Sequence, residues 1–250
     1  MENIYYFSKL SKRSGCFHLV TTKNSKYAFN FSLALHTGEN KKDILNNRRV
    51  LKENCPNMHF IVANQTHSSN IKIIYSKSEL GWSSENSAIS NCDALITNQK
   101  NIALTILTAD CVPILLFDPK KGVVSAVHAG WRGTEKKIVI KTIEKMIEEF
   151  GSNPKDIIAG IAPSIGRCCY EVDSEVAKKF TSYNNPFDRV GDKYMLDLPL
   201  INKEQLLTIG LKENNIELSN ICTSCEVNNY FSYRKEGGCS GRFMSIIANR

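Results

Sequence analysis

Between residues 102 and 128 the chain carries three short runs of β-branched and other apolar residues, and their spacing constrains the fold more than any other feature. The runs cover residues 102–107, 113–117 and 122–128. Apolar runs this short, separated by polar residues, are typical of strands. The sequence DPKKG (118–122) joins the second and third runs and favours a tight turn. We therefore expect an antiparallel hairpin near the middle of the chain.

Further runs with strand character predict a layered fold that mixes strands and helices. They cover residues 58–63, 71–75, 93–97 and 157–161. Residues 135–150 repeat apolar side chains at helical spacing, with Thr134 as the expected N-cap and Gly151 as the expected end. Later helices are expected at 173–181 and 202–214. The chain shows no internal repeat and no Pro/Gly-rich linker, so we expect one α/β or α+β domain over residues 1–250.

The composition excludes several classes of protein. The chain has 250 residues, 42% of them hydrophobic, and a formal charge of +7 spread along its length without a basic block, which argues against nucleic-acid binding. Its longest apolar run, 102–117, is too short and too polar to cross a bilayer. The N-terminus is charged where a secretory signal is apolar, so we expect a cytoplasmic protein. Nine cysteines without a framework spacing indicate free thiols or metal ligands.

The predicted hairpin brings polar side chains to one end of an apolar stretch. Asp110 and Cys111 precede the second run, and His128 ends the third. Antiparallel pairing places His128 opposite a residue within one or two positions of Cys111, and opposed side chains have Cβ atoms about 5 Å apart, which suits two ligands of one metal ion. A register shift of one residue would separate them. Cys111 alone would more often be a core residue, but a carboxylate in an apolar run costs several kcal/mol unless it is paired.

A third ligand and an anion site can be sought nearby. His67 lies where an apolar run gives way to small polar residues, beside Asn64 and Gln65. Of the remaining histidines, His18 and His36 have less informative surroundings, and His59 falls inside an expected strand, as a packed or edge histidine does. His128 is followed by AGWRGT (129–134) and a predicted helix. Backbone N–H groups and Arg132 could hold an anion there, or the segment could be an ordinary connection.

Five motifs together resemble the laccase-domain family, also named multicopper polyphenol oxidoreductase, YfiH-like or peptidoglycan editing factor. They are TADCVPILL, VHAGWRGT, NQTH, CDALIT and FSYRKEGGCSGR, and the resemblance runs from about Phe29 to the C-terminus. It implies an α+β fold, an α/β/β/α sandwich like the catalytic domain of cytotoxic necrotizing factor, and a monomer. It also implies a Zn²⁺ site whose ligands fall on His67, Cys111 and His128.

The resemblance further implies purine nucleoside substrates. The expected reactions are phosphorolysis of adenosine, inosine, guanosine and methylthioadenosine, and deamination of adenosine. In this reading Asp110 moves a proton next to a zinc-activated water, while Arg48 and Arg132 hold phosphate. The remaining candidate substrate-binding residues are Asn64, Gln65, Arg234 and Arg242. The family is also implicated in editing peptidoglycan precursors, and an amidase using the same zinc site is the alternative.

Three chemistries compete for these residues. A multicopper oxidase needs many histidines in His-X-His pairs, and five histidines without such a pair cannot supply them. A thiol hydrolase would use Cys111 as nucleophile and His128 as base. A catalytic zinc ion would have three protein ligands and an open fourth position for water, and we favour it. A non-enzymatic zinc protein, with a fourth protein ligand closing the site, stays open.

The chain departs from the family pattern at several positions. Ser68 follows His67 where the family usually has Gly, VTTKNSKYAF (20–29) lacks the usual Arg and Gly-Gly, and Glu39 replaces an Asp. Near the C-terminus Cys222 and Cys225 form a CxxC, and Cys239 follows. A structural zinc ion would also need Cys168 or Cys169, but the chain has no second CxxC and the resemblance gives these positions no metal role, so the sequence argues against one.

Overall fold

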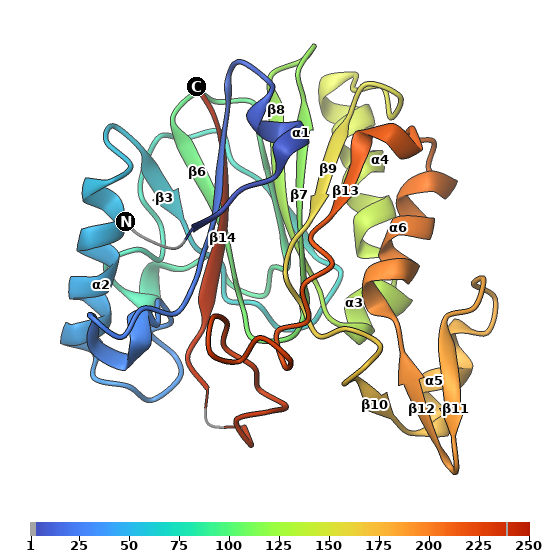
Figure 1. Cartoon of the computed structure of the whole chain (residues 1–250). Helices are drawn as coiled ribbons and strands as arrows, with labels where there is room; N and C mark the ends of the chain where they lie inside the picture. Colours follow the sequence, from blue (N-terminus) through green and yellow to red (C-terminus); the bar gives the residue numbers. More distant parts are fainter. Residues whose placement is uncertain (1–3, 239) are drawn as a thin grey trace.

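Two β-sheets packed face to face form the centre of the molecule (Figure 1). The computed structural model describes residues 4–238 and 240–250. In spatial order the five-stranded sheet contains β1 (Ile4–Tyr5), β2 (Cys16–Thr21), β14 (Phe243–Asn249), β6 (Ile102–Thr108) and β3 (His59–Ile61). The six-stranded sheet contains β13 (Ile216–Leu218), β9 (Ile158–Ile161), β7 (Val112–Asp118), β8 (Val123–Ala129), β5 (Ala94–Thr97) and β4 (Ile71–Ile73).

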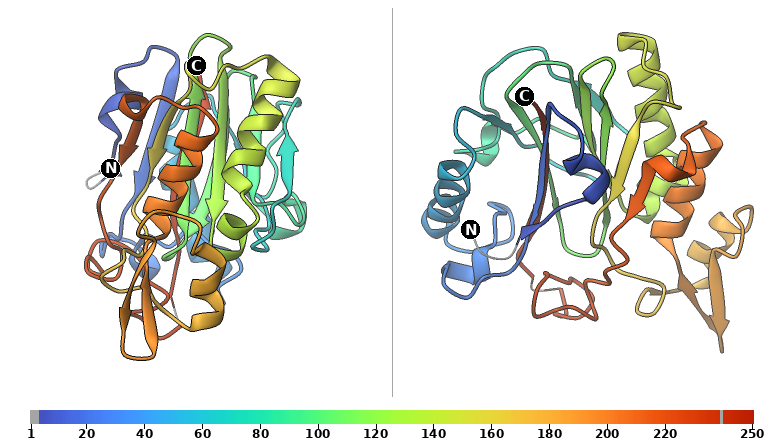
Figure 2. Two further views of the ribbon diagram at one scale, coloured as in Figure 1. Left: turned by 90° about the vertical axis from the view of Figure 1, so that its right-hand side faces the viewer. Right: turned by 45° about the horizontal axis from the view of Figure 1, so that its top comes forward.

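Helices cover the outer faces of both sheets. Helix α2 (Lys41–Glu53) lies against the five-stranded sheet, on the left in Figure 1. Helices α4 (Ile138–Phe150) and α6 (Leu198–Thr208) lie side by side on the six-stranded sheet, as the left view of Figure 2 shows. The layers therefore follow the order α/β/β/α, which agrees with the expected mixed fold. No helix in the described part of the chain is long and apolar enough to cross a membrane.

Shorter elements complete the fold. A three-stranded sheet of β10 (Glu171–Val172), β12 (Lys193–Leu196) and β11 (Phe187–Val190) lies at the lower right of Figure 1 with α5 (Ser174–Ala177). The short helices α1 (Ser8–Ser11) and α3 (Trp131–Glu135) precede β2 and α4. Four 3₁₀ turns cover Ala28–Phe31, Glu85–Ser87, Lys178–Phe180 and Glu213–Asn215.

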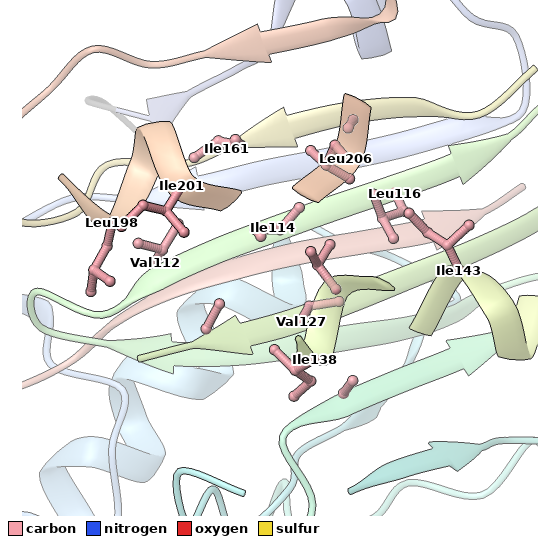
Figure 3. Packing of buried hydrophobic residues seen from close by; sticks show 14 of the residues in the cluster. Val112, Ile114, Leu116, Val127, Ile138, Ile143, Ile161, Leu198, Ile201 and Leu206 are labelled. Carbon is pink, nitrogen blue, oxygen red and sulfur yellow. The ribbon is translucent and has the colours of Figure 1, made fainter. Parts of the chain in front are cut away.

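Strand β7 is apolar from Val112 to Phe117 because both of its faces are buried. Val112, Ile114 and Leu116 point to the layer of α4 and α6, where Figure 3 shows them among Ile138, Ile143, Leu198, Ile201 and Leu206. The alternate residues Leu115 and Phe117 point to the five-stranded sheet and belong to the core between the sheets. Side chains alternate between the two faces of a strand, so one strand contributes to two cores.

The predicted hairpin is confirmed. Strands β7 and β8 pair antiparallel with Val112 opposite Ala129 and Pro113 opposite His128. The turn between them is stabilised by Asp118, whose Oδ1 accepts hydrogen bonds from the backbone N–H groups of Lys120 and Lys121. All seven predicted strands are present, with ends that differ by at most two residues. The register places His128 and Cys111 at the same end of the hairpin.

The predicted helices are present with corrected limits. Thr134 is not the N-cap of the 135–150 helix: residues 131–135 form the separate helix α3, and α4 begins at Ile138 after Lys137, which has a left-handed backbone (φ 58°). Gly151 ends α4 as expected, with φ 65°. The 202–214 helix lies instead at Leu198–Thr208, because the side chain of Asp197 caps it by accepting a hydrogen bond from the Leu200 N–H. The 173–181 segment divides into α5 and a 3₁₀ turn.

Candidate metal centre and cavity

Three side chains from separate parts of the chain meet at the end of the β7–β8 hairpin. His128 lies on β8, Cys111 directly precedes β7, and His67 lies in the loop between β3 and β4. Their potential ligand atoms all lie within 4.8 Å of one another, and Cys111 Sγ is 3.7 Å from His67 Nε2. Two imidazoles and a thiol at this spacing are a typical donor set for a single zinc ion. The predicted trio is therefore one cluster.

A buried carboxylate orients His128. Asp93, directly before β5, places Oδ1 2.8 Å from His128 Nδ1, and both side chains are almost inaccessible to solvent. This contact occupies Nδ1 and leaves Nε2 for the cluster. Metal-binding histidines commonly contact a carboxylate in this way, because it sets the ring orientation and makes the ligand more basic.

The same carboxylate fixes the loop that carries His67. The backbone N–H groups of Thr66, His67 and Ser68 donate to the Asp93 oxygens at 3.2, 3.0 and 2.8 Å. The Ser68 hydroxyl adds a bond of 2.6 Å, which the glycine usual in the family would lack. His67 has a left-handed backbone with φ 59°, within the loop that surrounds the Asp93 carboxylate. One side chain therefore positions two of the three potential ligands.

Asp93 is the main site residue that the sequence analysis missed. Two signals point to it: it lies in the CDALIT motif, and it is a carboxylate at the start of the apolar run 93–97, where burial is costly unless the group is paired.

Electrostatic interactions prepare the cluster to bind a cation. Burial alone would raise the pKa of Cys111, but the adjacent His128 and His67 outweigh it and lower the pKa to about 6. Burial would lower the pKa of His128, whereas Cys111 and Asp93 raise it to about 9. Asp93 is likewise buried, yet hydrogen bonds from His128 and Ser68 hold its pKa well below the usual range. At neutral pH the sulfur is thus a thiolate, the form that binds metal.

Gly130 leaves the space that the cluster occupies. A Cβ atom at this position would lie 3.0 Å from both Cys111 Sγ and His67 Cδ2. That distance is tighter than ordinary van der Waals contact, so a larger residue would displace the potential ligands. The glycine at position 130 therefore avoids a tight contact with two of the potential ligands.

A cavity of about 500 Å³ opens over the cluster, a size typical of small-molecule sites. Basic and aromatic side chains make up much of its wall: Arg132, Arg234, Arg242, His36, Trp131, Tyr170 and Tyr233. Each of the three guanidinium groups lies over an aromatic ring: Arg132 over Trp131, Arg234 over Tyr170 and Arg242 over Tyr233. The predicted residues Arg132, Arg234 and Arg242 thus share one cavity with the cluster.

Asp110 also lines the cavity and connects three segments of the chain around it. Its Oδ1 accepts a 2.6 Å bond from the Thr223 hydroxyl, its Oδ2 accepts a 2.7 Å bond from the backbone N–H of Arg234, and its carbonyl accepts from the backbone N–H of Ile165. Its backbone is left-handed, with φ 90°, which is uncommon for a residue with a side chain. Non-glycine residues in such conformations concentrate at functional sites.

The structure separates Arg48 and Asn64 from the other candidates. Arg48 is 2% exposed, and its guanidinium donates to the carbonyls of Leu33, Gly81 and Trp82, so it holds loops together and does not line the cavity. Asn64 is exposed outside the cavity. Gln65 does line it, but its amide forms two hydrogen bonds with the backbone of Leu107. These contacts explain Arg48 and Gln65 as parts of the framework.

Three cavity residues, His36, Tyr170 and Tyr233, could not be found by spacing in the sequence. His36 lies in the cavity, where burial and the nearby Arg242 lower its pKa. Tyr170 and Tyr233 are likewise cavity residues that the sequence analysis did not single out. No local pattern marks a residue as part of a wall built from several segments that lie far apart in the sequence.

Comparison with known proteins identifies the family. A model of the family described as "Multi-copper polyphenol oxidoreductase laccase" matches residues 17–250. The chain belongs to this family. The family's name notwithstanding, the described residues contain a single His/Cys cluster, and the other potential metal-binding group among them consists of four cysteines.

Named relatives share most of the chain. "Purine nucleoside phosphorylase YlmD" of Bacillus subtilis (strain 168) is 34% identical over 91% of this chain and 86% of its own length. A "Purine nucleoside phosphorylase" of Bacteroides thetaiotaomicron is 34% identical over 96% of this chain and 94% of its own. "Adenosine deaminase RL5", from an unknown prokaryotic organism, is 35% identical over 75% and 74%. These family members are named as enzymes that act on nucleosides.

Solved structures of the family share the fold. The hypothetical protein YfiH of Bacillus licheniformis has a TM-score of 0.93 and 30% identity over 100% of this chain and 97% of its own. YlmD from Geobacillus stearothermophilus has a TM-score of 0.91 and 31% identity over 98% and 94%.

Proposed function

We propose that this family member is a zinc-dependent purine nucleoside phosphorylase that also deaminates adenosine. The observation that carries the proposal is the position of the His67–Cys111–His128 cluster at the base of a cavity that also presents three arginines. Its substrates would be adenosine, inosine, guanosine and methylthioadenosine, together with phosphate. The relatives named as phosphorylases and as an adenosine deaminase support both activities.

The three side chains fit a zinc ion. Their donor atoms are two imidazole nitrogens and a sulfur that is a thiolate at neutral pH, and Asp93 presets His128. Bound there, a zinc ion with three protein ligands supplies a Lewis acid and lowers the pKa of water in its open position. Binding also requires that His128 release the proton that its raised pKa favours in the metal-free protein.

The cavity wall suits a nucleoside and phosphate. Guanidinium groups bind phosphate with paired charge-assisted hydrogen bonds, and Arg132, Arg234 and Arg242 all face the cavity. Tyr233, which is 55% exposed, and Trp131 offer ring faces for a purine base. In phosphorolysis a phosphate oxygen forms a bond to the anomeric carbon while the bond to the purine nitrogen breaks, and the arginines hold the attacking group in place.

Asp110 is proposed to move the proton in deamination. It is the one carboxylate among the described residues that line the cavity. The Thr223 hydroxyl donates to one carboxylate oxygen of Asp110, and the backbone N–H of Arg234 donates to the other. These two bonds fix the carboxylate and leave further lone pairs on its oxygens that can accept a proton. We further propose that the protein acts as a monomer in the cytoplasm. A likeness to the cytotoxic necrotizing factor domain stays a prediction.

A thiol hydrolase is the second candidate because the lowered pKa of Cys111 next to His128 is also what a nucleophilic cysteine needs. The two proposals predict opposite effects of metal. Removing zinc with a chelator abolishes phosphorolysis if the ion is catalytic, whereas a thiol hydrolase becomes free to react. A muropeptide in the same substrate panel tests the amidase alternative.

The deciding experiment measures phosphate-dependent base release from a nucleoside panel, with metal analysis of the same sample. We expect release from adenosine, inosine, guanosine or methylthioadenosine that requires phosphate and is restored by zinc after chelation. Cys16→Ser is a control outside the cluster and should behave like the unmodified protein. A zinc-loaded, folded protein that releases no base from any nucleoside would contradict the proposal and leave a non-enzymatic zinc protein.

A further inference from the structure

A second group of cysteines lies on two loops beside the cavity. Strands β9 and β13 are parallel neighbours, so the loops that follow them leave the sheet at the same end (Figure 1). Their backbones pair directly, with Ser164 opposite Cys222. Four sulfur atoms on these loops lie within 4.8 Å of one another. They belong to Cys168, Cys169, Cys222 and Cys225, which we call the four-cysteine cluster.

We propose that the four-cysteine cluster binds one zinc ion as a second, structural metal site. Cys225 Sγ lies 3.6 Å from Cys168 Sγ and 3.5 Å from Cys169 Sγ. A tetrahedral zinc ion with Zn–S bonds of about 2.3 Å has sulfur–sulfur edges of about 3.8 Å. The sulfurs therefore need only small shifts to coordinate a single ion. An iron–sulfur cluster interposes several atoms between its cysteine ligands and needs a wider arrangement.

The backbone around the sulfurs supports metal binding. The N–H of Gly166 donates to Cys222 Sγ at 3.3 Å, and the N–H of Cys225 donates to the same sulfur. Such bonds stabilise negative charge on a sulfur ligand. Gly166 also leaves room, because a Cβ there would lie 3.3 Å from the Cys222 Cβ and 3.5 Å from Cys168 Sγ. Cys168 and Cys225 are exposed, which provides an entry path for the ion.

The sequence argued against this site because the chain has no second CxxC. The structure supplies the second pair as the adjacent residues Cys168 and Cys169, held in a turn in which the N–H groups of Cys169 and Tyr170 both donate to the Gly166 carbonyl. Cys239 lies outside the described residues and has no part in the proposal.

A metal ion here would fix the wall of the cavity. Ile165 and Tyr170 flank the Cys168–Cys169 pair and line the cavity, and Thr223 lies between Cys222 and Cys225. The Thr223 hydroxyl and the Ile165 N–H both bind Asp110. The ion would therefore crosslink the two loops that hold Asp110, without contacting substrate.

Zinc stoichiometry tests the proposal separately from the proposed function. Protein purified under reducing conditions with zinc should contain about two zinc ions per chain, one at each cluster. Cys225→Ser and Cys222→Ser should each lose one ion and keep the ion at Cys111, whereas Cys111→Ser should keep the ion at the four-cysteine cluster. The matched control Cys16→Ser should keep both.

A spectroscopic readout needs no change at the four-cysteine cluster. Cobalt bound to the Cys111→Ser protein should give intense thiolate-to-cobalt charge transfer and the visible bands of a tetrahedral site, and X-ray absorption of its zinc form should show a sulfur-only shell at about 2.3 Å. The proposal is overturned if Cys111→Ser binds no metal. It is also overturned if mass spectrometry of the zinc-treated protein finds disulfides among these cysteines.

Discussion

Asp93 shows how much of the site depends on one residue that does not face the cavity. Its carboxylate binds His128 Nδ1 and accepts bonds from three consecutive N–H groups and the Ser68 hydroxyl. It therefore sets the ring of one potential ligand and the backbone of another. In the Asp93→Asn variant the amide keeps one oxygen but loses the charge and replaces the other acceptor by a donor.

We expect Asp93→Asn to weaken zinc binding at the first cluster by about 10- to 100-fold, the range typical of lost partners of metal-binding histidines. Competition with a chromophoric chelator measures this directly. Asp156→Asn, which changes a surface carboxylate paired with Lys120, is the control. An Asp93→Asn protein with unchanged zinc affinity would show that the carboxylate serves folding alone.

Replacing Cys111 distinguishes two roles for this residue, a metal ligand and a buried thiol. In Cys111→Ser a neutral hydroxyl replaces a thiolate, so the variant should lose zinc from the first cluster and base release together, with the fold intact by circular dichroism. Elemental analysis of the unmodified protein should find zinc and no stoichiometric copper. Full activity in a variant without this metal, or several copper ions per chain with a blue absorption band, would contradict the assignment.

Arg132 tests the phosphate site. If its guanidinium holds the attacking phosphate, Arg132→Ala should raise the KM for phosphate by roughly ten- to hundredfold, the equivalent of a charged hydrogen bond of about 1.5–3 kcal/mol. Deamination uses water, so conversion of adenosine to inosine should fall much less. The ratio of the two rates is the observable because it cancels losses of metal or folded protein. Equal losses in both rates with zinc retained would direct the search to Arg234 and Arg242.

Among the helices and strands, the sequence predicted those that are encoded by a pattern of neighbouring residues. The β7–β8 hairpin could be predicted because short apolar runs flank a turn sequence. Helix α2 could not, because Asn47 and Arg48 occupy part of its buried face beside Ile44 and Leu51, and this interrupts the apolar stripe of a surface helix. The pairing of β14 with β2 and β6 joins residues far apart in the sequence, and no local pattern reports it.

The same limit applies to the site. The cluster could be predicted as far as the hairpin, since Cys111 and His128 belong to one local unit. Predicting His67 as a ligand required knowing where a strand ends. Predicting the cavity wall required the tertiary fold. The framework contacts of Arg48 could not be predicted, because an arginine whose three partners are backbone carbonyls leaves no trace of them in the sequence.

Strand β9 packs against the N-terminal segment so closely that only glycine fits at one position. A Cβ at Gly160 would lie 2.6 Å from the ring of the fully buried Phe7. Gly160→Ala should therefore lower the free energy of unfolding by about 1–3 kcal/mol, the usual cost of overpacking a core. Urea denaturation measures the loss.

A second substitution separates this clash from a general effect on the strand. Phe7→Leu removes the ring atoms that the added methyl group would meet, so Gly160→Ala should cost less in the Phe7→Leu background than alone. Equal costs in both backgrounds would show that the contact with Phe7 is not the reason for the glycine.

For the whole molecule, the pH dependence of stability in the metal-free state follows from a few buried groups. His128 has its pKa raised to about 9 and Cys111 has its pKa lowered to about 6. Near neutral pH the folded protein carries one proton on this pair, at His128, because Cys111 is deprotonated. The unfolded chain also carries about one proton on the pair, at Cys111, because its histidine is mostly neutral. Stability should therefore change little from this pair between pH 6.5 and 8.5.

Below about pH 6.5, His18 makes the stability of the folded protein depend on pH. It is 3% exposed, its Nε2 accepts a 2.9 Å bond from the Phe7 N–H, and burial lowers its pKa to about 4. The unfolded chain protonates this residue near its ordinary pKa of about 6.5. Between these two values the unfolded state binds more protons, so stability falls as the pH falls, by up to about 1.4 kcal/mol per pH unit and about 3 kcal/mol in total. His36, whose pKa is also lowered, acts in the same direction.

Urea denaturation with a chelator present, at intervals from pH 8 to pH 4, measures this profile. The unmodified protein should have nearly constant stability down to pH 6.5 and then a decline. His18→Gln keeps an acceptor for the Phe7 N–H without a titrating ring, so it should lose most of the decline and retain the smaller part due to His36. The explanation fails if His18→Gln declines as steeply as the unmodified protein, because the acid sensitivity would then arise from the carboxylates, with Asp93 first among them.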